Sequence, residues 1–229
     1  MKTYLEPHEI TLMEKAASNL RDKLLIRMLF HLGCRVTEAL GVSENDIDFK
    51  QNILTIKHLK RRLKLICPVC AARIGAAHVF CPKCGGKIEK SHKEEHEHHR
   101  QRILPVDEGT ITLLKEYIDR GGPVEKNGRL LIFNINRHRA WQIVKDCAEK
   151  SGLPKLVNPE TGKIHHISPH KLRDAFAVMA VKQNDTGDGL RMLQEHLGHQ
   201  SFNTTAKYRK VAGEEHRDWY NRLWEKDQP

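Results

Sequence analysis

The sequence predicts an α+β protein that is mostly α-helical and contains one small three-stranded sheet. Several segments of ten or more residues carry apolar side chains at helical spacing, which indicates helices with one buried face. Only three short runs have strand character, each bounded by turn residues or proline. A chain of 229 residues can bury a full core, as one large domain or as one domain with a small module.

The first part of the chain is predicted to form three helices, over residues 7–18, 21–32 and 35–42. Gly33 ends the second of them. In this helix the apolar residues recur every three or four positions, which predicts that one face packs into the core. That face consists of Leu24, Leu25, Met28, Leu29 and Leu32.

The three strands are predicted at residues 46–49, 52–59 and 101–106. The first two are joined by a turn at residues 50–51. The third ends at Pro105, as an edge or terminal strand can. A basic cluster follows the second strand, and because it lies at the end of a hairpin we expect it to contact a polyanion. It consists of Lys57, Lys60, Arg61, Arg62 and Lys64.

The remaining segments are predicted from the same patterns. Helices are expected at residues 108–120 and 136–150, with a short apolar run at 130–133 between them. Residues 152–163 are predicted to be a loop. Residues 91–99 are polar, and this run is either flexible or the returning arm of a hairpin. A last helix is predicted at residues 214–226, after Gly213, with Trp219, Tyr220, Leu223 and Trp224 on one side.

Two stretches near the C-terminus carry residues suited to phosphate chemistry. Ser168 can cap a helix and Pro169 fits its first turn, so His170 and Arg173 fall at a helix N-terminus, where anions are favoured. A second helix ends at Gly198, and His199 and Tyr208 follow. These residues predict a phosphate held for attack by a phenol oxygen. The buried stripe of the first helix is predicted to be Leu172, Phe176, Met179 and Ala180.

The composition favours a polyanionic partner. Lys and Arg number 39 against 29 Asp and Glu, which gives a formal charge of +10 and a pI near 9.4. Such a balance favours nucleic acid before membrane. No apolar run approaches the roughly 18 residues that span a bilayer, and the N-terminus lacks the apolar segment of a signal peptide. We therefore expect a soluble, cytoplasmic protein.

Four of the six cysteines form two Cys-Pro-x-Cys units, at Cys67 and Cys70 and at Cys81 and Cys84. In a chain without an export signal this spacing indicates metal binding rather than disulfides. Each unit presents two thiolates from one tight turn, and two units complete a closed tetrahedral site. We predict a small ribbon with structural Zn²⁺. Cys34 and Cys147 are predicted to be packing thiols.

Taken together, these motifs resemble the catalytic domain of tyrosine recombinases of the phage integrase and Xer type. Residues 33–40, Gly-Cys-Arg-Val-Thr-Glu-Ala-Leu, resemble the first arginine box of that family, and Arg102-Ile-Leu-Pro resembles the strand that follows its catalytic lysine. His170-x-x-Arg173 and Leu197-Gly-His199 match the second and third boxes, and Tyr208 has the spacing of the nucleophile. Asp174 stands where many members have His, outside the family's catalytic set.

The resemblance implies a DNA-breaking and rejoining enzyme acting through a 3′-phosphotyrosyl intermediate. It implies catalytic roles for Arg35, Lys60, His170, Arg173, His199 and Tyr208. In that scheme two guanidiniums neutralise the phosphate, Tyr208 attacks, and His170 accepts or steers its proton. His199 hydrogen-bonds a non-bridging oxygen. Lys60 protonates the leaving oxygen, with Lys57 and Lys64 as alternatives. Glu38, one turn beyond Arg35, is expected to orient that guanidinium. No cofactor is needed for the chemistry, because the phosphotyrosine retains the bond energy.

The resemblance also implies partners: double-stranded DNA and a homotetramer in which the last helix docks on a neighbouring subunit. Two other functions remain open: a nicking-closing enzyme similar to type IB topoisomerases, and a zinc-dependent DNA-binding regulator with an idle pocket. The resemblance extends from about residue 5 to the C-terminus, interrupted by residues 65–99, and residues 1–229 are expected to form one catalytic domain with that insertion. The separate core-binding domain of full-length members is expected to be absent.

The position of the interruption leads to a further hypothesis. The ribbon interrupts the hairpin that should deliver Lys60, so we expect it to extend that hairpin across DNA, with a simple spacer as the alternative. Lys57, Arg61, Arg62 and Lys64 are the expected DNA contacts.

Overall fold

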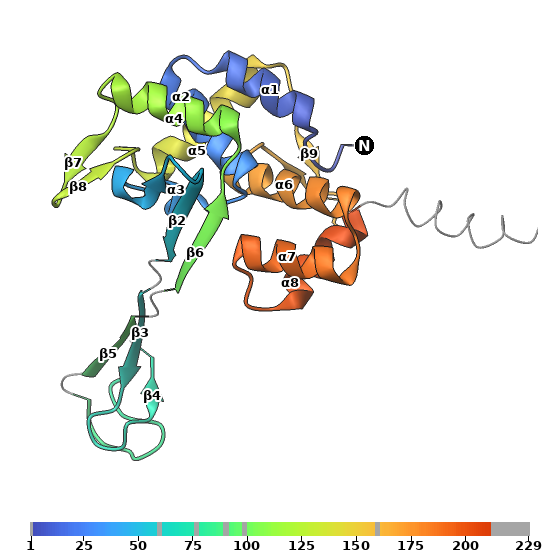
Figure 1. Cartoon of the computed structure of the whole chain (residues 1–229). Coiled ribbons are helices and arrows are strands. Elements are labelled where there is room, and N and C mark those ends of the chain that lie inside the picture. The colour runs from blue at the N-terminus through green and yellow to red at the C-terminus, as the bar shows by residue number, and fades with distance from the viewer. Residues whose placement is uncertain are drawn as a thin grey trace, which may run out of the picture. The chain divides into compact units, whose positions relative to one another are not determined.

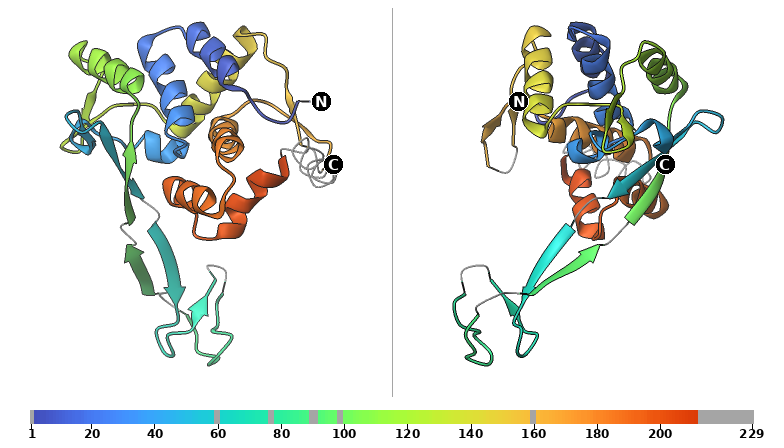
Figure 2. Two further views of the ribbon diagram at one scale, coloured as in Figure 1. Left: turned by 45° about the vertical axis from the view of Figure 1, so that its right-hand side comes forward. Right: turned by 90° about the vertical axis from the view of Figure 1, so that its left-hand side faces the viewer.

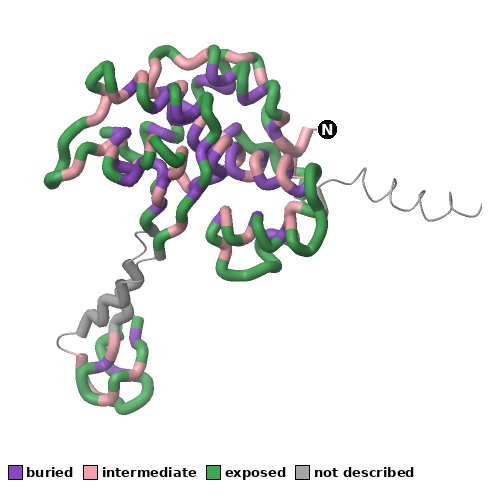
Figure 3. Tube along the Cα trace, viewed as in Figure 1, coloured by how far each residue is buried: buried purple, intermediate pink, exposed green. Residues whose placement is uncertain are grey.

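The computed structural model describes residues 2–58, 61–75, 78–88, 92–97, 100–158 and 161–211 (Figure 1). The chain divides into two compact units, of which the first comprises residues 1–56 and 102–229 and the second residues 57–101. The first unit contains nearly all of the helices and the main hydrophobic core. Figure 3 shows the buried residues of this unit concentrated where its helices meet.

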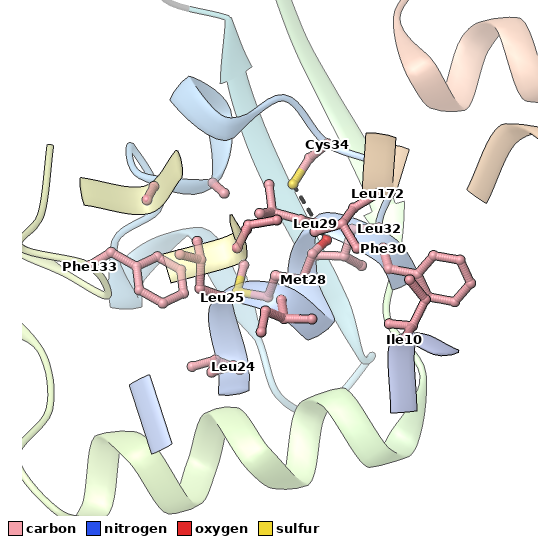
Figure 4. Packing of buried hydrophobic residues seen from close by; sticks show 14 of the residues in the cluster. Ile10, Leu24, Leu25, Met28, Leu29, Phe30, Leu32, Cys34, Phe133 and Leu172 are labelled. Atoms are coloured by element: carbon pink, nitrogen blue, oxygen red, sulfur yellow. Dashed lines mark hydrogen bonds between the residues drawn. The ribbon is translucent and has the colours of Figure 1, made fainter. Parts of the chain in front are cut away.

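Three helices open the first unit: α1 (Pro7–Ala16), α2 (Leu20–His31) and α3 (Val36–Ala39). Helix α2 begins where the side chain of Asn19 accepts a hydrogen bond from the backbone N–H of Asp22. The apolar face predicted for it is fully buried. Figure 4 shows side chains of this helix packed with Leu172, which comes from a helix more than a hundred residues later.

Gly33 ends α2 in the left-handed conformation, with φ of +53°, as predicted for a C-terminal glycine. Its lack of a side chain is also needed for packing. A Cβ at this position would lie 2.5 Å from the ring of Phe176, so any other residue would require that ring to shift. Gly33 therefore both stops α2 and lets the Phe176 ring pack closely against its end.

The predicted three-stranded sheet is present, in the order β1–β2–β6, with bounds Ile47–Asp48, Ile53–His58 and Arg100–Pro105. A short 3-10 helix, η1 (Glu44–Asp46), leads into β1. Strands β1 and β2 are antiparallel, with Ile47 opposite Leu54. Leu54, Ile56 and Leu104 alternate into the core and are nearly inaccessible. The sheet therefore presents one face to the helices, as period-two burial requires.

Helices α4 (Glu108–Asp119) and α5 (Arg137–Lys150) follow within two residues of the predicted bounds. Between them lies a hairpin, β7 (Val124–Lys126) and β8 (Arg129–Leu131), of which only an apolar run was predicted. Its turn is Asn127-Gly128, and both residues have positive φ. This dipeptide is a strong hairpin signal, because both central residues of a type I′ turn need that conformation.

The loop predicted at residues 152–163 is wrong in part. Leu156–Val157 (β9) pairs with Ile164–His165 (β10) in a small antiparallel hairpin. The backbone N–H of Val157 also donates to the carbonyl of Lys2, which ties this hairpin to the N-terminal segment. Neither strand has an alternating pattern long enough to be recognised in the sequence.

The C-terminal helices of the described chain are α6 (Pro169–Gln183), α7 (Gly187–Leu197) and α8 (Phe202–Ala206), followed by the 3-10 turn η2 (Lys207–Val211). Figure 1 shows α7 beside α6, and α8 packs against α7; Figure 2 gives two further views of this region. Gly198 ends α7 with φ of +66°, as predicted. The helix predicted at residues 214–226 lies outside the described residues.

The buried face of α6 differs from the predicted stripe. Leu172 is fully buried, but Phe176, Met179 and Ala180 are only partly buried. Residues on other sides of the helix are buried instead, because α6 packs against α2 on one side and α7 on another. A helix enclosed from several directions has no single apolar stripe. The buried residues of α6 are Pro169, Leu172, Arg173, Ala175, Ala177, Val178 and Val181.

The second unit is built on strand β3 (Arg61–Ile66), which pairs antiparallel with β4 (Arg73–Ile74) and β5 (His92–Glu97). Residues 92–97 therefore form the returning arm of a hairpin. Where burial is described in this unit, at residues 57, 66–75, 78–88 and 101, the buried residues are Cys67, Ile74 and Cys81. Across the described residues of both units, none of the helices is long and apolar enough to cross a membrane.

Candidate functional site

The first arginine box forms a rigid ion pair at the start of α3. Glu38 accepts hydrogen bonds from both the backbone N–H and the guanidinium of Arg35, each at 2.9 Å. The predicted contact between Glu38 and Arg35 is thus present. The Arg35 side chain remains 33% exposed, so its guanidinium is oriented by Glu38 and still accessible to a ligand.

Arg102 provides a second guanidinium for the same carboxylate. Its two terminal nitrogens donate to the two oxygens of Glu38 at 3.1 and 2.7 Å. Burial raises the pKa of Glu38, but the hydrogen bond and charge of Arg102, together with Arg35, outweigh it and lower that pKa to about 2. Glu38 is therefore an anion held between two arginines.

Arg102 was not predicted as a site residue, although the sequence contains a signal for it. It lies two residues before Leu104 and four before Val106, both of which are buried. Period-two alternation places Arg102 on the same inward face of the sheet. A cation on an inward face predicts a buried anionic partner, here Glu38.

The second arginine of the predicted site, Arg173, is 2% exposed. One guanidinium nitrogen donates to the carbonyl of Gly33 at 2.6 Å, and the other donates to the carbonyl of Leu197 at 2.8 Å. Burial, and then the charge of Arg35, lowers the pKa of Arg173 to about 10. Arg173 therefore stays charged near neutral pH and links the ends of α2 and α7 to α6.

His199 is held on both ring nitrogens. Nε2 lies 3.0 Å from the guanidinium of Arg173, and Nδ1 lies 2.9 Å from the hydroxyl of Thr205. Since Arg173 can only donate, Nε2 accepts, and Nδ1–H donates to Thr205. Burial, followed by the charges of Arg173 and Arg35, lowers the pKa of His199 to about 4. His199 is thus a neutral ring near neutral pH.

The neutral state of His199 predicts a loss of stability in mild acid. Its pKa in the folded protein, about 4, lies below the ordinary value of 6.5, so between these values the unfolded chain binds more protons. Stability present above pH 6.5 is therefore lost as the pH falls toward 4. Burial lowers the pKa of His196 as well, which adds to the same effect.

Urea unfolding of His199→Gln is expected to show a smaller loss of stability across this pH range than unfolding of the unaltered protein. His8→Gln, which removes an exposed histidine, is the matched control and should leave the pH dependence unchanged. Glu38 acts in a lower window, from 4.5 down to about 2, so the two effects separate. An identical pH dependence in His199→Gln would contradict the assignment.

Tyr208 lies beside these residues, with its ring stacked on that of His199 at a centroid distance of 6.2 Å. Its hydroxyl donates to the carboxylate of Asp174 at 3.0 Å. Burial, and then Asp174, raises the pKa of Tyr208 above its ordinary value of 10.0. The phenol is therefore protonated at rest, and any attack by its oxygen must be accompanied by loss of that proton.

His170 approaches the carboxylate that accepts the Tyr208 hydrogen bond. Its side chain is 74% exposed, and Nε2 lies 3.7 Å from Asp174 Oδ1. The same Asp174 oxygen thus lies near both His170 and the Tyr208 hydroxyl. Ser168 occupies the N-cap position of α6 as predicted, although its side chain makes no capping hydrogen bond.

A pocket of about 250 Å³ opens beside Arg35. This volume has room for several water molecules, and so for a group of phosphate size. Three arginines contribute to its wall, and Arg137, at the first turn of α5, was not predicted. Such a set of guanidiniums is suited to an anion. The lining residues are Cys34, Arg35, Val36, Thr37, Arg137, Pro169, His170 and Arg173.

The predicted DNA-contacting residues belong to the second unit. Lys60 lies outside the described residues. Arg61, Arg62 and Lys64 lie in β3, where their backbone positions pair with Glu97, His96 and Glu94 of β5. Lys57, at the start of this unit, is exposed.

The four ribbon cysteines lie together. All four sulfur atoms are within 4.8 Å of one another. Cys67 Sγ is 3.7 Å from Cys84 Sγ, and Cys70 Sγ is 3.6 Å from Cys81 Sγ. A tetrahedral Zn²⁺ with Zn–S bonds of about 2.3 Å separates its sulfur ligands by about 3.8 Å. This donor set therefore fits Zn²⁺.

The two Cys-Pro-x-Cys units share one backbone conformation. The residues that follow each unit, Ala71 and Gly85, both have positive φ, and their N–H groups donate to the carbonyls of Cys67 and Cys81. The N–H groups of Cys67 and Cys81 in turn donate to the carbonyls of Ala72 and Gly86. Each unit is thus a closed turn that points two sulfurs in one direction.

Comparison with known proteins places this arrangement in a family. The tyrosine recombinase XerD of Neisseria meningitidis serogroup B is 29% identical over 201 residues, which cover 84% of this chain and 51% of that protein. XerC of Herpetosiphon aurantiacus is 28% identical over 214 residues, covering 90% of this chain and 53% of that protein. The chain thus spans about half the length of these curated relatives.

Solved structures show the same fold. The XerA recombinase crystal structure superposes with a TM-score of 0.64 at 20% identity, covering 97% of this chain and 64% of that one. The catalytic domain of bacteriophage HP1 integrase superposes with a TM-score of 0.54 at 14% identity, covering 93% and 89%. The sequence matches the phage integrase family over residues 3–215. The chain therefore belongs to the phage integrase family and has the catalytic-domain fold of the tyrosine recombinases.

Proposed function

We propose that this protein is a site-specific DNA recombinase that cleaves and rejoins DNA through a 3′-phosphotyrosyl intermediate. The observation that carries the proposal is the placement of one tyrosine hydroxyl beside a fixed set of phosphate-binding groups. Arg173 contacts His199, whose ring stacks on Tyr208. Arg173 also shares the pocket with Arg35.

In the proposed reaction the Tyr208 oxygen attacks the scissile phosphorus, and the 5′ oxygen of DNA leaves. Arg35 and Arg173 offset the charge that builds on the non-bridging oxygens, and both are already oriented by Glu38 and by backbone carbonyls. At rest both ring nitrogens of His199 are engaged, by Arg173 and Thr205, so one of these contacts must be exchanged before His199 donates to such an oxygen. We assign protonation of the leaving oxygen to Lys60.

The chemistry itself needs no nucleotide or metal, because the phosphotyrosyl bond conserves the energy of the phosphodiester. The released 5′-hydroxyl of a partner strand then attacks that bond, and Tyr208 leaves. Removal of chelatable metal should therefore affect cleavage only through the second unit, which includes Lys60.

For the ribbon we propose structural Zn²⁺ bound by Cys67, Cys70, Cys81 and Cys84. The fit of the sulfur distances and the matched turns support this assignment. When bound, zinc supplies cross-linking of the two turns. It has no catalytic role in this scheme, because four protein ligands leave no open position for substrate.

Double-stranded DNA is the proposed substrate and partner. The formal charge of +10 favours a polyanion, and among similar structures is that of XerH recombinase bound to its difH substrate. We further propose a homotetramer on DNA in which the last helix docks on a neighbouring subunit. Lys57, Arg61, Arg62 and Lys64 remain the proposed DNA contacts of the second unit.

Replacing Tyr208 with phenylalanine is expected to abolish covalent capture of DNA. The change removes only the hydroxyl that donates to Asp174 and leaves the ring stacked on His199. The measurement incubates each protein with a nicked suicide duplex carrying its target site and detects protein–DNA adducts stable in SDS. Noncovalent binding of the duplex should be retained, because no guanidinium is lost.

Tyr4→Phe is the matched control, since it also removes one phenol hydroxyl but lies in the N-terminal segment. It should form adduct at the unaltered rate. An adduct that persists in Tyr208→Phe would overturn the assignment of the nucleophile. Absence of any adduct on a bound, verified target would favour the idle DNA-binding regulator, and relaxation of supercoils without strand exchange would favour the topoisomerase-like function.

A further inference from the structure

Asp174 is the group in contact with the Tyr208 hydroxyl. The 3.0 Å hydrogen bond joins the phenol to Oδ1 of this carboxylate. Two basic side chains of α6, one turn earlier, approach the same carboxylate: Nε2 of His170 at 3.7 Å and Nζ of Lys171 at 3.6 Å. The carboxylate is 20% exposed, so it is partly shielded from water. A carboxylate oriented by neighbouring cations and hydrogen-bonded to a phenol is well placed to exchange a proton with it.

Other groups near Tyr208 do not fit this role. His199 stacks on the phenol, but its Nε2 accepts from Arg173 and its Nδ1–H donates to Thr205. Neither nitrogen is therefore available to take a further proton in this arrangement. Arg173 can only donate. Among the described residues, Asp174 is the acceptor that the phenol hydroxyl uses.

Resting on the recombinase function proposed above, we propose that Asp174 is a catalytic residue that accepts the Tyr208 proton directly during cleavage. His170 and Lys171 are positioning residues that hold its carboxylate. This assignment differs from the sequence-based expectation, in which His170 takes the proton and Asp174 has no role.

The step is balanced within the site. As the bond between Tyr208 Oη and phosphorus forms, the O–H bond of Tyr208 breaks and its proton passes to Asp174 Oδ1. The bond between phosphorus and the 5′ oxygen breaks, and that oxygen takes a proton from Lys60 in the proposed scheme. In rejoining, a 5′-hydroxyl attacks phosphorus, and Tyr208 leaves as a phenol by taking its proton back from Asp174.

The negative charge of Asp174 repels a phosphate bound nearby, and neighbouring cations reduce this repulsion. The cations of α6 nearest to Asp174 are Lys171 and, when protonated, His170. The charges of Arg173 and Arg35 act on Tyr208 and favour loss of its proton, whereas Asp174 opposes it. Transfer of the Tyr208 proton to Asp174 is therefore favoured only as the bond between the phenol oxygen and phosphorus forms, because that bond makes the O–H group more acidic. Loss of the proton is thus coupled to attack.

Asp174→Asn separates proton acceptance from simple holding of the hydroxyl. The amide oxygen can still accept the hydrogen bond, but it cannot take the proton. Single-turnover adduct formation on a nicked suicide duplex is expected to fall at least about 100-fold, within the usual contribution of general acid–base catalysis. Noncovalent DNA affinity should be unchanged or tighter, because one negative charge beside the phosphate is removed.

Asp174→His, which restores the residue that many family members have, is the rescue variant. Its rate should exceed that of Asp174→Asn, with the acidic limb of the pH–rate profile near the imidazole value of about 6.5. A second readout is the Tyr208 titration, obtained from phenolate absorbance as the difference from Tyr208→Phe. Asp174→Asn should lower the pKa of Tyr208, since it removes a carboxylate that raises it.

The outcomes distinguish the two proposals. If the wild type forms adduct and Asp174→Asn forms it at the same rate, the proposed role of Asp174 is overturned and the recombinase function stands. A slow Asp174→Asn whose Tyr208 titration is unchanged also overturns it, because the loss then arises elsewhere. No wild-type adduct on a bound, verified target overturns the function and this step together.

Discussion

Replacing Arg173 with lysine is expected both to abolish adduct formation and to destabilise the fold. The buried guanidinium serves the carbonyls of Gly33 and Leu197 and the Nε2 of His199. An ammonium group cannot reproduce this planar fork. Each buried acceptor left without a partner costs about 1–3 kcal/mol, so a marginally stable domain is expected to lose a substantial part of its stability.

The lysine would also tend to lose its charge. Burial and the nearby charge of Arg35 lower the pKa of Arg173 to about 10. Lysine begins from an ordinary pKa of about 10.4, so the same surroundings bring its titration toward working pH. A neutral amine cannot offset the charge of a phosphate, which adds a catalytic defect to the structural one.

Arg35→Lys is the matched control. Its side chain is 33% exposed and contacts Glu38, which keeps its pairing with Arg102. This variant is expected to lose adduct formation while keeping most of the thermal stability. Thermal unfolding and adduct rates measured on both variants decide the matter: an Arg173→Lys protein that melts with the wild type would contradict the structural role.

Removing zinc is expected to unfold the second unit and leave the first unit folded. In the part of the ribbon whose burial is described, three residues are buried, Cys67, Ile74 and Cys81, with a few partly buried neighbours. This is too little apolar area to balance the entropy of ordering such a segment, so small modules of this kind need a metal. Structural zinc in zinc-finger peptides contributes about 10–16 kcal/mol of binding free energy.

The experiment measures zinc stoichiometry and amide hydrogen exchange before and after chelation, and in Cys81→Ser. Protection should vanish in residues 57–101 and persist in α2 and α6. Cys147→Ser, which alters a buried thiol of the first unit, is the matched control and should retain zinc. A metal-free protein with full protection in the ribbon would contradict the assignment. Measuring DNA affinity of the chelated protein tests in addition whether the ribbon contacts DNA or is a spacer.

Much of the fold follows from local pattern. The longer helices, the three-stranded sheet and the stops at Gly33 and Gly198 were predicted because each depends on neighbours within a few residues, whereas α8 was not predicted and α3 is shorter than the predicted 35–42. The β7–β8 hairpin could have been predicted from Asn127-Gly128. The β9–β10 hairpin could not, because strands of two residues carry no usable periodicity.

Some residues of the candidate site were likewise predicted from the sequence, and others were found only in the structure. The sequence identified Arg35, Arg173, His199 and Tyr208 by motif and spacing, and the structure brings them into one site of the first unit. It assigned no role to Asp174, Arg102 or Arg137. Their roles depend on which faces of α6, β6 and α5 meet other elements.

The sequence by itself therefore determined which groups are present: two arginine boxes, a histidine, a tyrosine and four paired cysteines. The tertiary structure decided which atoms touch. Packing of α6 against both α2 and α7 buries Arg173 against Gly33 and Leu197, and the turn of η2 sets Tyr208 on Asp174 rather than on His170. The physical reason is that sequence spacing determines which face of a helix a residue occupies. The acceptor of a hydrogen bond depends instead on the distance between atoms of elements that are far apart in the chain.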